Sequence, residues 1–406
     1  MTWLPPTDRL TAEQTSAVDA PADRPLIVRG GPGSGKTVVL LHRARRLIAT
    51  SGQPGKIRLL VFTNVLRDFI RSAVAELGLA EEAVQTFDHW CRLRHLELIG
   101  PPPTDQRGYP DFEAIRGGLL THLRARPFPP TLDAALVDEG QDLSDDCYAL
   151  LRLSARHVTV AFDLKQSLYR EAGDAAIRHG LGSGPRECDL RATYRACPFV
   201  IDLACEFIAE ETERAAFRAQ TATTQTEKQT PLLYLAADEA DERRRLVEIL
   251  RERLLRNERV AILFPTFPQV GLFADFLRDQ GIVADRQPQT DRQGRREALD
   301  FASGRPAVLT YHSAKGLTFD SVLLPGVTKT AIRARHSSAR RMLFVAITRA
   351  TRWVYASSQA KDCNEAMLSA MGKLQTMRRG LVQTKADLPR APQPPPVRAA
   401  DDWKDI

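Results

Sequence analysis

The stretch Gly30-Gly31-Pro32-Gly33-Ser34-Gly35-Lys36-Thr37 decides the fold of this chain of 406 residues. It fits the pattern G-x-x-x-x-G-K-[ST], in which backbone N–H groups of a glycine-rich loop surround phosphate oxygens. The apolar run at 25–29 predicts a strand before the loop, and the periodic pattern at 36–50 predicts a helix after it. This order predicts a nucleoside-triphosphate site in an α/β fold. A chance glycine turn is the alternative, and the flanking elements disfavour it.

Each side chain at the end of the loop has an expected task. Lys36 is long enough to reach the β- and γ-phosphates, and the hydroxyl of Thr37 is a ligand for Mg²⁺. The helix that begins near Lys36 adds the positive end of its dipole. The loop residues expected to bind the nucleotide are Gly30, Gly33, Ser34, Gly35, Lys36 and Thr37.

Two carboxylates, Asp138 and Glu139, directly follow the apolar run at 134–137. In open α/β sheets the carboxyl ends of the strands form the edge that binds ligands. Asp138 is therefore expected to hold Mg²⁺ through water, and Glu139 to polarise the attacking water. An Asp-Glu pair alone often marks only the start of a helix. Downstream of a phosphate loop, it predicts hydrolysis of a nucleoside triphosphate.

Short apolar runs alternate with helical patterns along the chain, which predicts open, mostly parallel sheets with crossover helices. We expect a first, ATP-binding domain at 1–188 with a small insertion at about 90–132, and a second domain at 189–378. The polar segment 212–230 is expected to be irregular, and the proline-rich tail at 379–406 to be disordered.

Composition sets limits on the partners and the compartment. Lys and Arg number 57 against 50 Asp and Glu, and the net charge of +7 permits a polyanionic partner without proving one. The six cysteines are scattered and form no Cys-x-x-Cys pair, which is typical of idle thiols in a reducing compartment. No apolar run approaches the roughly 20 residues that span a bilayer. We therefore expect a soluble, cytoplasmic protein that does not contact a membrane.

Further short segments follow one another along nearly the whole chain. They are LTAEQ at 10–14, LVFTN at 60–64, TFDHW at 86–90, VDEGQD at 137–142, DLKQSLY at 163–169, LRATYR at 190–195, TYHSAKGLTF at 310–319 and FVAITRA at 344–350. Together with the phosphate loop, this ordered series resembles the motifs of UvrD/Rep-like superfamily 1 DNA helicases. The resemblance implies two RecA-like domains of parallel sheet, with ATP and Mg²⁺ between them.

For the nucleotide, the resemblance implies contacts from both domains. Gln14 is expected to read the edge of the adenine, and Tyr194 to stack on it. Gln166 is expected to sense the γ-phosphate, Arg195 to reach it, and Arg349 to act as the arginine finger. Because the loop and the carboxylates lie on one domain and the arginines on the other, ATP is expected to draw the domains together.

For nucleic acid, the resemblance implies a path for single-stranded DNA across both domains, with movement from 3′ to 5′. Each aromatic residue on this path could instead be an ordinary core side chain. His312 could instead be a hydrogen-bonded histidine at the end of a strand. The expected DNA contacts are Phe62, Thr63, Asn64, Thr86, Phe87, Trp90, Tyr169, His312 and Ser313.

The chain departs from the family pattern at several positions. Val38 stands where relatives have an arginine that sandwiches the adenine, so an aliphatic surface is expected against the base. Thr318 replaces a glutamate that contacts the ribose, and Glu171 replaces an aromatic residue that stacks on DNA. The two large accessory subdomains have little or no room. The chain therefore resembles a compact motor core.

Two functional hypotheses remain open. The first is an ATP-dependent helicase or translocase on single-stranded DNA, including tailed or gapped duplexes. The second is a nucleic-acid-stimulated ATPase that does not unwind DNA by itself and signals to a nuclease or another protein partner, as in antiphage defence. A P-loop kinase is a third reading, which Gln166 and the two arginines of the second domain, Arg195 and Arg349, disfavour.

Overall fold

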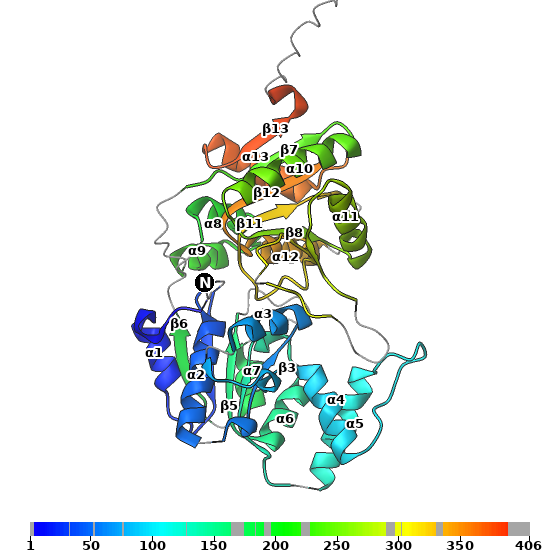
Figure 1. Ribbon diagram of the computed structural model, residues 1–406. Coiled ribbons are helices and arrows are strands. Elements are labelled where there is room, and N and C mark those ends of the chain that lie inside the picture. The colour runs from blue at the N-terminus through cyan, green and yellow to red at the C-terminus, as the bar shows by residue number, and fades with distance from the viewer. Residues whose placement is uncertain are drawn as a thin grey trace, which may run out of the picture.

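A computed structural model describes residues 4–31, 33–51, 53–74, 77–126, 128–163, 174–182, 184–190, 196–220, 228–289, 297–301, 303–329 and 336–388. Four of the predicted site residues, Gln166, Tyr169, Tyr194 and Arg195, lie outside these ranges, as does Glu171. Figure 1 shows two α/β bodies, one above the other.

The first body is built on a six-stranded sheet in which every neighbouring pair is parallel. In spatial order the strands are β3 (Val84–Thr86), β2 (Ile57–Val61), β4 (Leu132–Val137), β5 (Ala155–Phe162), β1 (Leu26–Gly30) and β6 (Arg186–Leu190). The helices are α1 (Ala12–Asp19), α2 (Lys36–Ser51), α3 (Asn64–Val74), α4 (Phe87–Leu98), α5 (Phe112–Ala125), α6 (Asp145–Ser154) and α7 (Asp174–Leu181).

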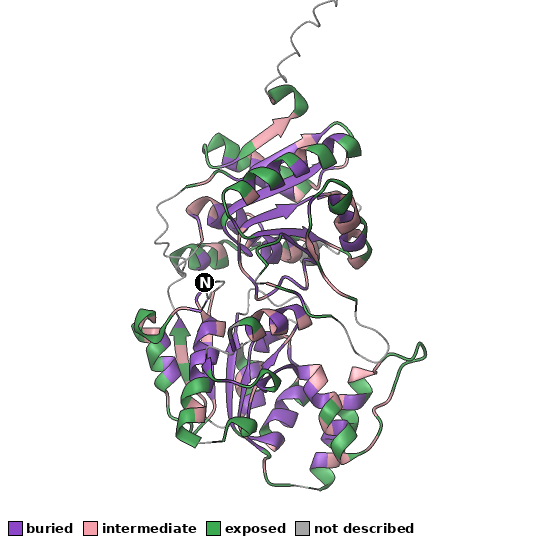
Figure 2. Cartoon of the chain, in the orientation of Figure 1, coloured by how far each residue is buried: buried purple, intermediate pink, exposed green. Residues whose placement is uncertain are grey.

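Strand β1 shows why these residues form a central strand. Leu26 and Val28 pack into the core cluster on one face of the sheet, and Ile27 packs into the cluster on the other. A strand with helices on both faces needs a continuous apolar run, because successive side chains point to opposite sides. Figure 2 shows the result as buried strands between helices that are partly exposed.

The second body holds a seven-stranded sheet, whose neighbouring pairs are also all parallel. In spatial order its strands are β13 (Leu381–Thr384), β7 (Leu232–Ala236), β12 (Ala350–Gln359), β11 (Phe319–Leu324), β8 (Val260–Phe264), β10 (Ala307–Thr310) and β9 (Asp285–Arg286). Its helices are α8 (Pro198–Cys205), α9 (Glu211–Gln220), α10 (Glu239–Leu255), α11 (Phe267–Asp279), α12 (His336–Ile347) and α13 (Glu365–Thr376). The predicted fold class is confirmed.

Three details of the predicted organisation need correction. Strand β6 pairs with β1 through Leu190, so the first body extends beyond residue 188. Strand β13 pairs with β7, so the second body extends beyond residue 378 into the segment expected to be disordered. Part of the polar segment 212–230 belongs to α9, which buries Phe217 at 2% exposure.

The insertion between β3 and β4 consists of the helix pair α4 and α5, which pack against each other. Figure 1 shows this pair at the side of the first body. Among the described residues, no helix combines the length and the apolar character needed to cross a membrane.

Candidate nucleotide site between the two domains

The phosphate loop depends on glycine at specific positions. Gly33 and Gly35 have φ values of 76° and 86°, which side chains rarely allow. A Cβ at Gly30 would lie 2.3 Å from Ser34 Oγ, and a Cβ at Gly35 would lie 2.4 Å from Gln14 Nε2. The loop can therefore close between β1 and α2 only with these glycines.

Two side chains make the loop fit a phosphate group. Lys36 Nζ donates to Gly30 O at 2.8 Å and to Gly31 O at 3.1 Å, which holds its charge at the loop. The Ser34 hydroxyl oxygen is buried and finds no hydrogen-bond partner among the described residues. A buried hydroxyl of this kind needs a partner, and a phosphate oxygen would supply one. The observed residues therefore fit the expected triphosphate.

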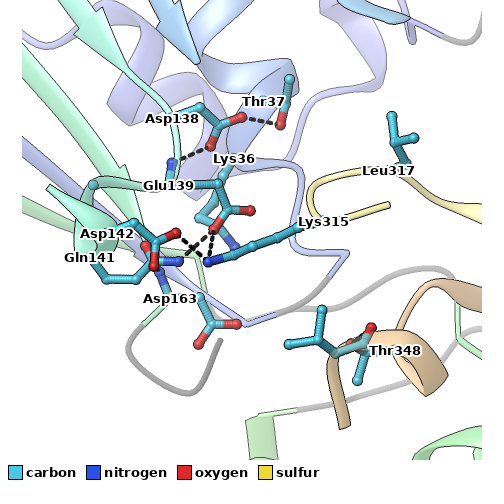
Figure 3. Close-up of polar contacts among 12 residues, drawn as sticks. Lys36, Thr37, Asp138, Glu139, Gln141, Asp142, Asp163, Lys315, Leu317 and Thr348 are labelled. Atoms are coloured by element: carbon cyan, nitrogen blue, oxygen red, sulfur yellow. Dashed lines mark hydrogen bonds and ion pairs between the residues drawn. The ribbon is translucent and has the colours of Figure 1, made fainter. Parts of the chain in front are cut away.

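Thr37 and Asp138 come together as the sequence predicts for an Mg²⁺ site. Thr37 Oγ1 donates to Asp138 Oδ2 at 2.6 Å (Figure 3). Burial, and then the charge of Glu139, raise the pKa of Asp138 to about 6. The described residues contain no cluster of three or more His, Cys, Asp or Glu that could hold a metal. A cation here would depend on these two side chains with phosphate and water oxygens, as is usual for Mg²⁺.

Glu139 has a different environment from its neighbour. Its backbone is left-handed, with φ 57° and ψ 42°, and Gln141 Nε2 donates to its Oε2 at 2.5 Å. Burial would raise the pKa of Glu139, but the charges of Lys315, Lys36 and Arg349 outweigh burial and lower the pKa. Glu139 is therefore ionised, as a residue that polarises water must be.

Gln141 connects this carboxylate to the next strand. Its side chain is fully buried, and its Oε1 accepts a hydrogen bond from the backbone N–H of Asp163 at 3.2 Å. Asp163 directly follows β5, so one amide group links the ends of β4 and β5. Movement of either strand end would therefore reorient Glu139.

Lys315 brings a positive charge from the second body into the first. Its side chain is 1% exposed, and its Nζ pairs with Asp142 and lies 3.6 Å from Glu139 Oε2. Figure 3 shows this side chain reaching Glu139 and Asp142, which both follow β4. A buried ion pair is costly to break, because the remaining charge loses its compensation. Contact between the bodies is thus tied directly to Glu139, the carboxylate expected to polarise water.

Arg349 lies near the site but is held by its own domain. Its Nε donates to Val345 O at 2.9 Å, and its two terminal nitrogens donate to Leu317 O and Thr348 Oγ1, both at 3.1 Å. Burial lowers its pKa, whereas the charges of Glu139 and Asp163 act in the opposite direction. The expected arginine finger therefore sits within electrostatic reach of Glu139.

Gln14 connects the first helix to the phosphate loop. Its Oε1 accepts from Thr11 N at 3.0 Å, and its Nε2 donates to Ser34 O at 2.9 Å. Val38 is 7% exposed and belongs to the core. Thr318 lines a cavity with Gly33 and Thr348, between the loop and the second body. The structure thus brings both Gln14 and Thr318 to the phosphate loop, Gln14 by a hydrogen bond to Ser34 and Thr318 through the cavity that it lines with Gly33.

Two residues expected to contact DNA meet across the domain boundary. The rings of Phe62 and His312 lie 5.8 Å apart at an interplanar angle of 70°. Thr63 Oγ1 accepts from Leu66 N and so caps α3, which begins at Asn64. Ser313 follows His312, and its N–H donates to Thr310 Oγ1 at 3.1 Å. Phe62 and His312 therefore meet where the two bodies touch, and Thr63, Asn64 and Ser313 are their neighbours in the chain, with Thr63 and Ser313 both 7% exposed.

Phe87, Trp90 and Thr86, three further residues expected to contact DNA, are buried. Phe87 and Trp90 lie on α4, are only 5% and 3% exposed, and pack in a core cluster of the first body with residues of α5. Their rings therefore leave little area on which a base could stack. The Thr86 hydroxyl accepts from His89 N and caps α4. These three residues have structural roles here, and their contact with DNA stays a prediction.

The sequence-based list of site residues contains neither Lys315 nor Asp142, whereas the resemblance gives Gln141 a role in coupling the ATP and DNA sites. All three lie within the motifs that carry the family resemblance, at 310–319 and 137–142. Their pairing depends on how two distant segments meet, which spacing along a chain cannot show.

Comparisons with known proteins agree with these motifs. Residues 10–97 match the model of the UvrD/REP helicase N-terminal domain, and residues 307–357 match the model of the UvrD-like helicase C-terminal domain. A search of curated proteins gave no significant match.

Many solved structures also match. One is the C-terminal domain of a possible DNA helicase from Lactobacillus plantarum WCFS1, at 14% identity. It covers 47% of this chain and 98% of its own, with a TM-score of 0.35. A TM-score this low does not establish a shared fold. The segment that matches the N-terminal model contains the phosphate loop, and the segment that matches the C-terminal model contains Lys315. Two segments of the chain, 10–97 and 307–357, are therefore similar to the N-terminal and C-terminal domains of UvrD-like helicases.

Proposed function

We propose that this chain is an ATP-dependent DNA helicase or translocase, which moves from 3′ to 5′ on single-stranded DNA and hydrolyses ATP between its two domains. The observation that carries the proposal is Lys315, a buried lysine of the second domain that pairs with Asp142 and approaches Glu139 of the first. An ATPase whose catalytic carboxylate senses the other domain can convert hydrolysis into domain movement. The direction of movement follows from the resemblance to UvrD-like helicases.

The residues divide the chemistry among them. The phosphate loop, Ser34 and Lys36 would bind the triphosphate, and Thr37 and Asp138 would hold Mg²⁺, which neutralises charge on the phosphates. Glu139, oriented by Gln141, would accept a hydrogen bond from the attacking water and take up its proton.

Charge from the second domain completes this arrangement. Arg349 would add positive charge where the γ-phosphate leaves, once the domains close further. Such arginines are worth roughly 10³–10⁵ in rate in related systems. Turnover is therefore expected to depend on how the domains meet.

The surface at Phe62, Asn64 and His312 is the proposed DNA contact, since Phe62 and His312 meet where the two bodies touch, and Lys315 follows closely in the chain. DNA bound there would touch both domains and would therefore alter the contact that places Lys315 beside Glu139. We therefore expect single-stranded DNA to raise the rate of ATP hydrolysis.

A second candidate function is a DNA-stimulated ATPase that signals to a partner protein and does not unwind. The burial of Phe87 and Trp90 favours it, because the first domain then offers fewer stacking surfaces than a stepping motor uses. A nuclease or another DNA-processing protein would be the partner.

The two functions are separated by measuring ATP hydrolysis with and without a single-stranded oligonucleotide, together with strand displacement on duplexes with a 3′ or a 5′ tail. Stimulation with displacement of the 3′-tailed duplex supports the helicase. Stimulation without displacement supports a translocase that does not unwind, or the sensor. Absence of stimulation by both DNA and RNA would refute both.

Variants of the catalytic groups test the site itself. Lys36→Ala and Glu139→Gln should each reduce turnover by at least about 10²-fold, since each removes a group that acts on the transition state. Lys56→Ala is the matched control, because Lys56 is exposed and lies outside the site. Normal hydrolysis in either site variant would show that the assignment is wrong.

A further inference from the structure

Arg43 is a fully buried arginine that lies on α2, seven residues after Lys36. Its described hydrogen bonds all go to neutral acceptors. Nε donates to Thr159 Oγ1 at 2.9 Å, and one terminal nitrogen lies 3.0 Å from His157 Nε2. Burial and the charge of Arg43 lower the pKa of His157 to about 4, so this imidazole is neutral and can accept. Burying a guanidinium costs free energy of folding, so a fully buried arginine is expected to have a specific role.

The remaining donor group of Arg43 holds the C-terminal end of α1. Its other terminal nitrogen donates to Ala17 O at 3.1 Å, Val18 O at 3.2 Å and Ala20 O at 2.7 Å. Carbonyl groups at the end of a helix have no partners within the helix, and a cation there also meets the negative end of the dipole. Arg43 therefore fixes one end of α1 to the helix that starts at the phosphate loop.

The other end of α1 carries Gln14. Thr11 and Gln14 form a reciprocal capping box, and Gln14 Nε2 donates to Ser34 O at 2.9 Å. A primary amide has two donor hydrogens and an acceptor with two lone pairs. After these contacts, each amide atom of Gln14 keeps one hydrogen-bonding position. That pair is the one with which a glutamine recognises the N6 and N7 edge of adenine.

We propose that Arg43 is a positioning residue for base recognition, which places Gln14 by fixing the opposite end of the short, rigid helix α1. This inference rests on the proposed ATP hydrolysis. It explains why α2, which binds phosphate at its start, buries a guanidinium two turns later. Only a planar group with five donors can serve three carbonyls, a hydroxyl and an imidazole together.

The experiment compares ATP with GTP, since guanine presents an acceptor where adenine has its N6 donor. Steady-state hydrolysis with saturating single-stranded DNA gives KM and kcat for both nucleotides, in the full chain. The variants are Arg43→Lys, Gln14→Ala and the double variant. Arg253→Lys is the matched control, because Arg253 is an arginine 6% exposed in the second domain, where it pairs with Glu258. Thermal unfolding checks that each variant folds.

We expect the wild type to prefer ATP. Arg43→Lys should raise KM for ATP about tenfold, the scale of one lost hydrogen bond, with kcat within about twofold and KM for GTP nearly unchanged. Gln14→Ala should do the same, and the double variant should be no worse than either single one. Arg253→Lys should keep the preference for ATP.

Equal losses for ATP and GTP in Arg43→Lys would overturn the proposal, as would additive effects in the double variant. A wild type that hydrolyses ATP with DNA stimulation but shows no base preference would also overturn it, and the proposed hydrolysis would stand. If Arg43→Lys does not fold, Thr159→Val provides the same test, because it removes one acceptor of Arg43 and keeps the side-chain volume.

Discussion

Asp138 and Glu139 are adjacent carboxylates with opposite electrostatic environments. Burial raises the pKa of Asp138, whereas surrounding lysines and Arg349 keep the pKa of Glu139 low. Neighbouring acids whose environments differ in this way usually have different tasks. Here the first points to Thr37 and the proposed cation, and the second to the space reached by Lys315 (Figure 3).

Lys315→Gln should separate the domain contact from nucleotide binding. The amide cannot neutralise Asp142 or Glu139, so DNA-stimulated turnover should fall by at least about tenfold. Binding of a fluorescent ADP analogue, which depends on the phosphate loop, should change by less than about threefold. Lys329→Gln is the control, because Lys329 is half exposed and pairs with an exposed glutamate. Full stimulation by DNA in Lys315→Gln would contradict the role given to this lysine.

His157 should make the first domain sensitive to acid. Its pKa is about 4 in the folded chain and about 6.5 when unfolded, so the unfolded chain binds more protons between these values. Its contribution to stability is complete above pH 6.5 and is lost as the pH falls toward 4, by roughly 3 kcal/mol.

Urea unfolding at pH 7 and pH 5 measures this contribution. His157→Gln should reduce the loss of stability between the two values, because glutamine has no proton to gain. Part of the loss should remain, since burial and Lys315 also lower the pKa of His312 to about 4. An unchanged pH dependence in His157→Gln would exclude this histidine as its source.

Gly140 shows how one element end constrains the site. It lies between Glu139 and Gln141, and a Cβ there would come within 2.2 Å of Val160 Cγ1. Tyr148 Oη also donates to Gly140 O at 2.7 Å, which fixes the turn from the side of α6. The turn that orients Glu139 therefore packs against β5 so tightly that a side chain at residue 140 would not fit.

Gly140→Ala should lower the free energy of unfolding by about 1–3 kcal/mol and reduce turnover, because the turn must shift away from β5. Gly117→Ala is the opposite control. Gly117 lies in α5 with open space around it, and alanine there should be neutral or stabilise by up to about 1 kcal/mol. Equal stability of the two variants would show that the contact at Val160 can relax.

The elements that sequence predicts well are those with strong local patterns. The phosphate loop and the run that ends at Asp138 were expected where they lie, because a buried parallel strand needs a continuous apolar run. Strand β13 has only four residues at a sheet edge, which is too short for a clear alternation, and α9 is mostly polar, so its composition hides the helix that buries Phe217. The burial of Phe87 and Trp90 was not predicted, because a motif places a side chain on an element without telling which face the core covers.

At the scale of the whole molecule, the contact between the domains is the part that sequence could not give. Lys315 and Asp142 are 173 residues apart, so no single motif contains both partners of this contact. The contact between α3 and the second domain also joins residues that are distant in the sequence. A Cβ at Gly316 would lie 2.8 Å from Leu66 Cδ2, so the two bodies touch closely there.

Helix α3 also holds the segment 297–301 of the second domain. Asp68 Oδ2 accepts from Leu299 N at 3.2 Å, and the rings of Phe69 and Phe301 lie 5.3 Å apart, edge to face. Asp68 is buried, and its other oxygen pairs with Arg67 at 3.0 Å. This contact and the Lys315 contact join the same two bodies at different points, so loosening one should weaken the other.

Phe301→Ala tests that coupling. Loss of the ring contact should loosen the domain boundary, so backbone hydrogen exchange should increase in α3 and stay unchanged in the central strand β1. DNA-stimulated turnover should fall about threefold to tenfold with unchanged nucleotide binding, because Lys315 then reaches Glu139 in fewer molecules. Phe128→Ala is the control, since Phe128 is 51% exposed on the first domain and should alter neither quantity. Faster exchange in α3 with full turnover would mean that the two contacts act independently, and that Lys315 alone couples the domains to hydrolysis.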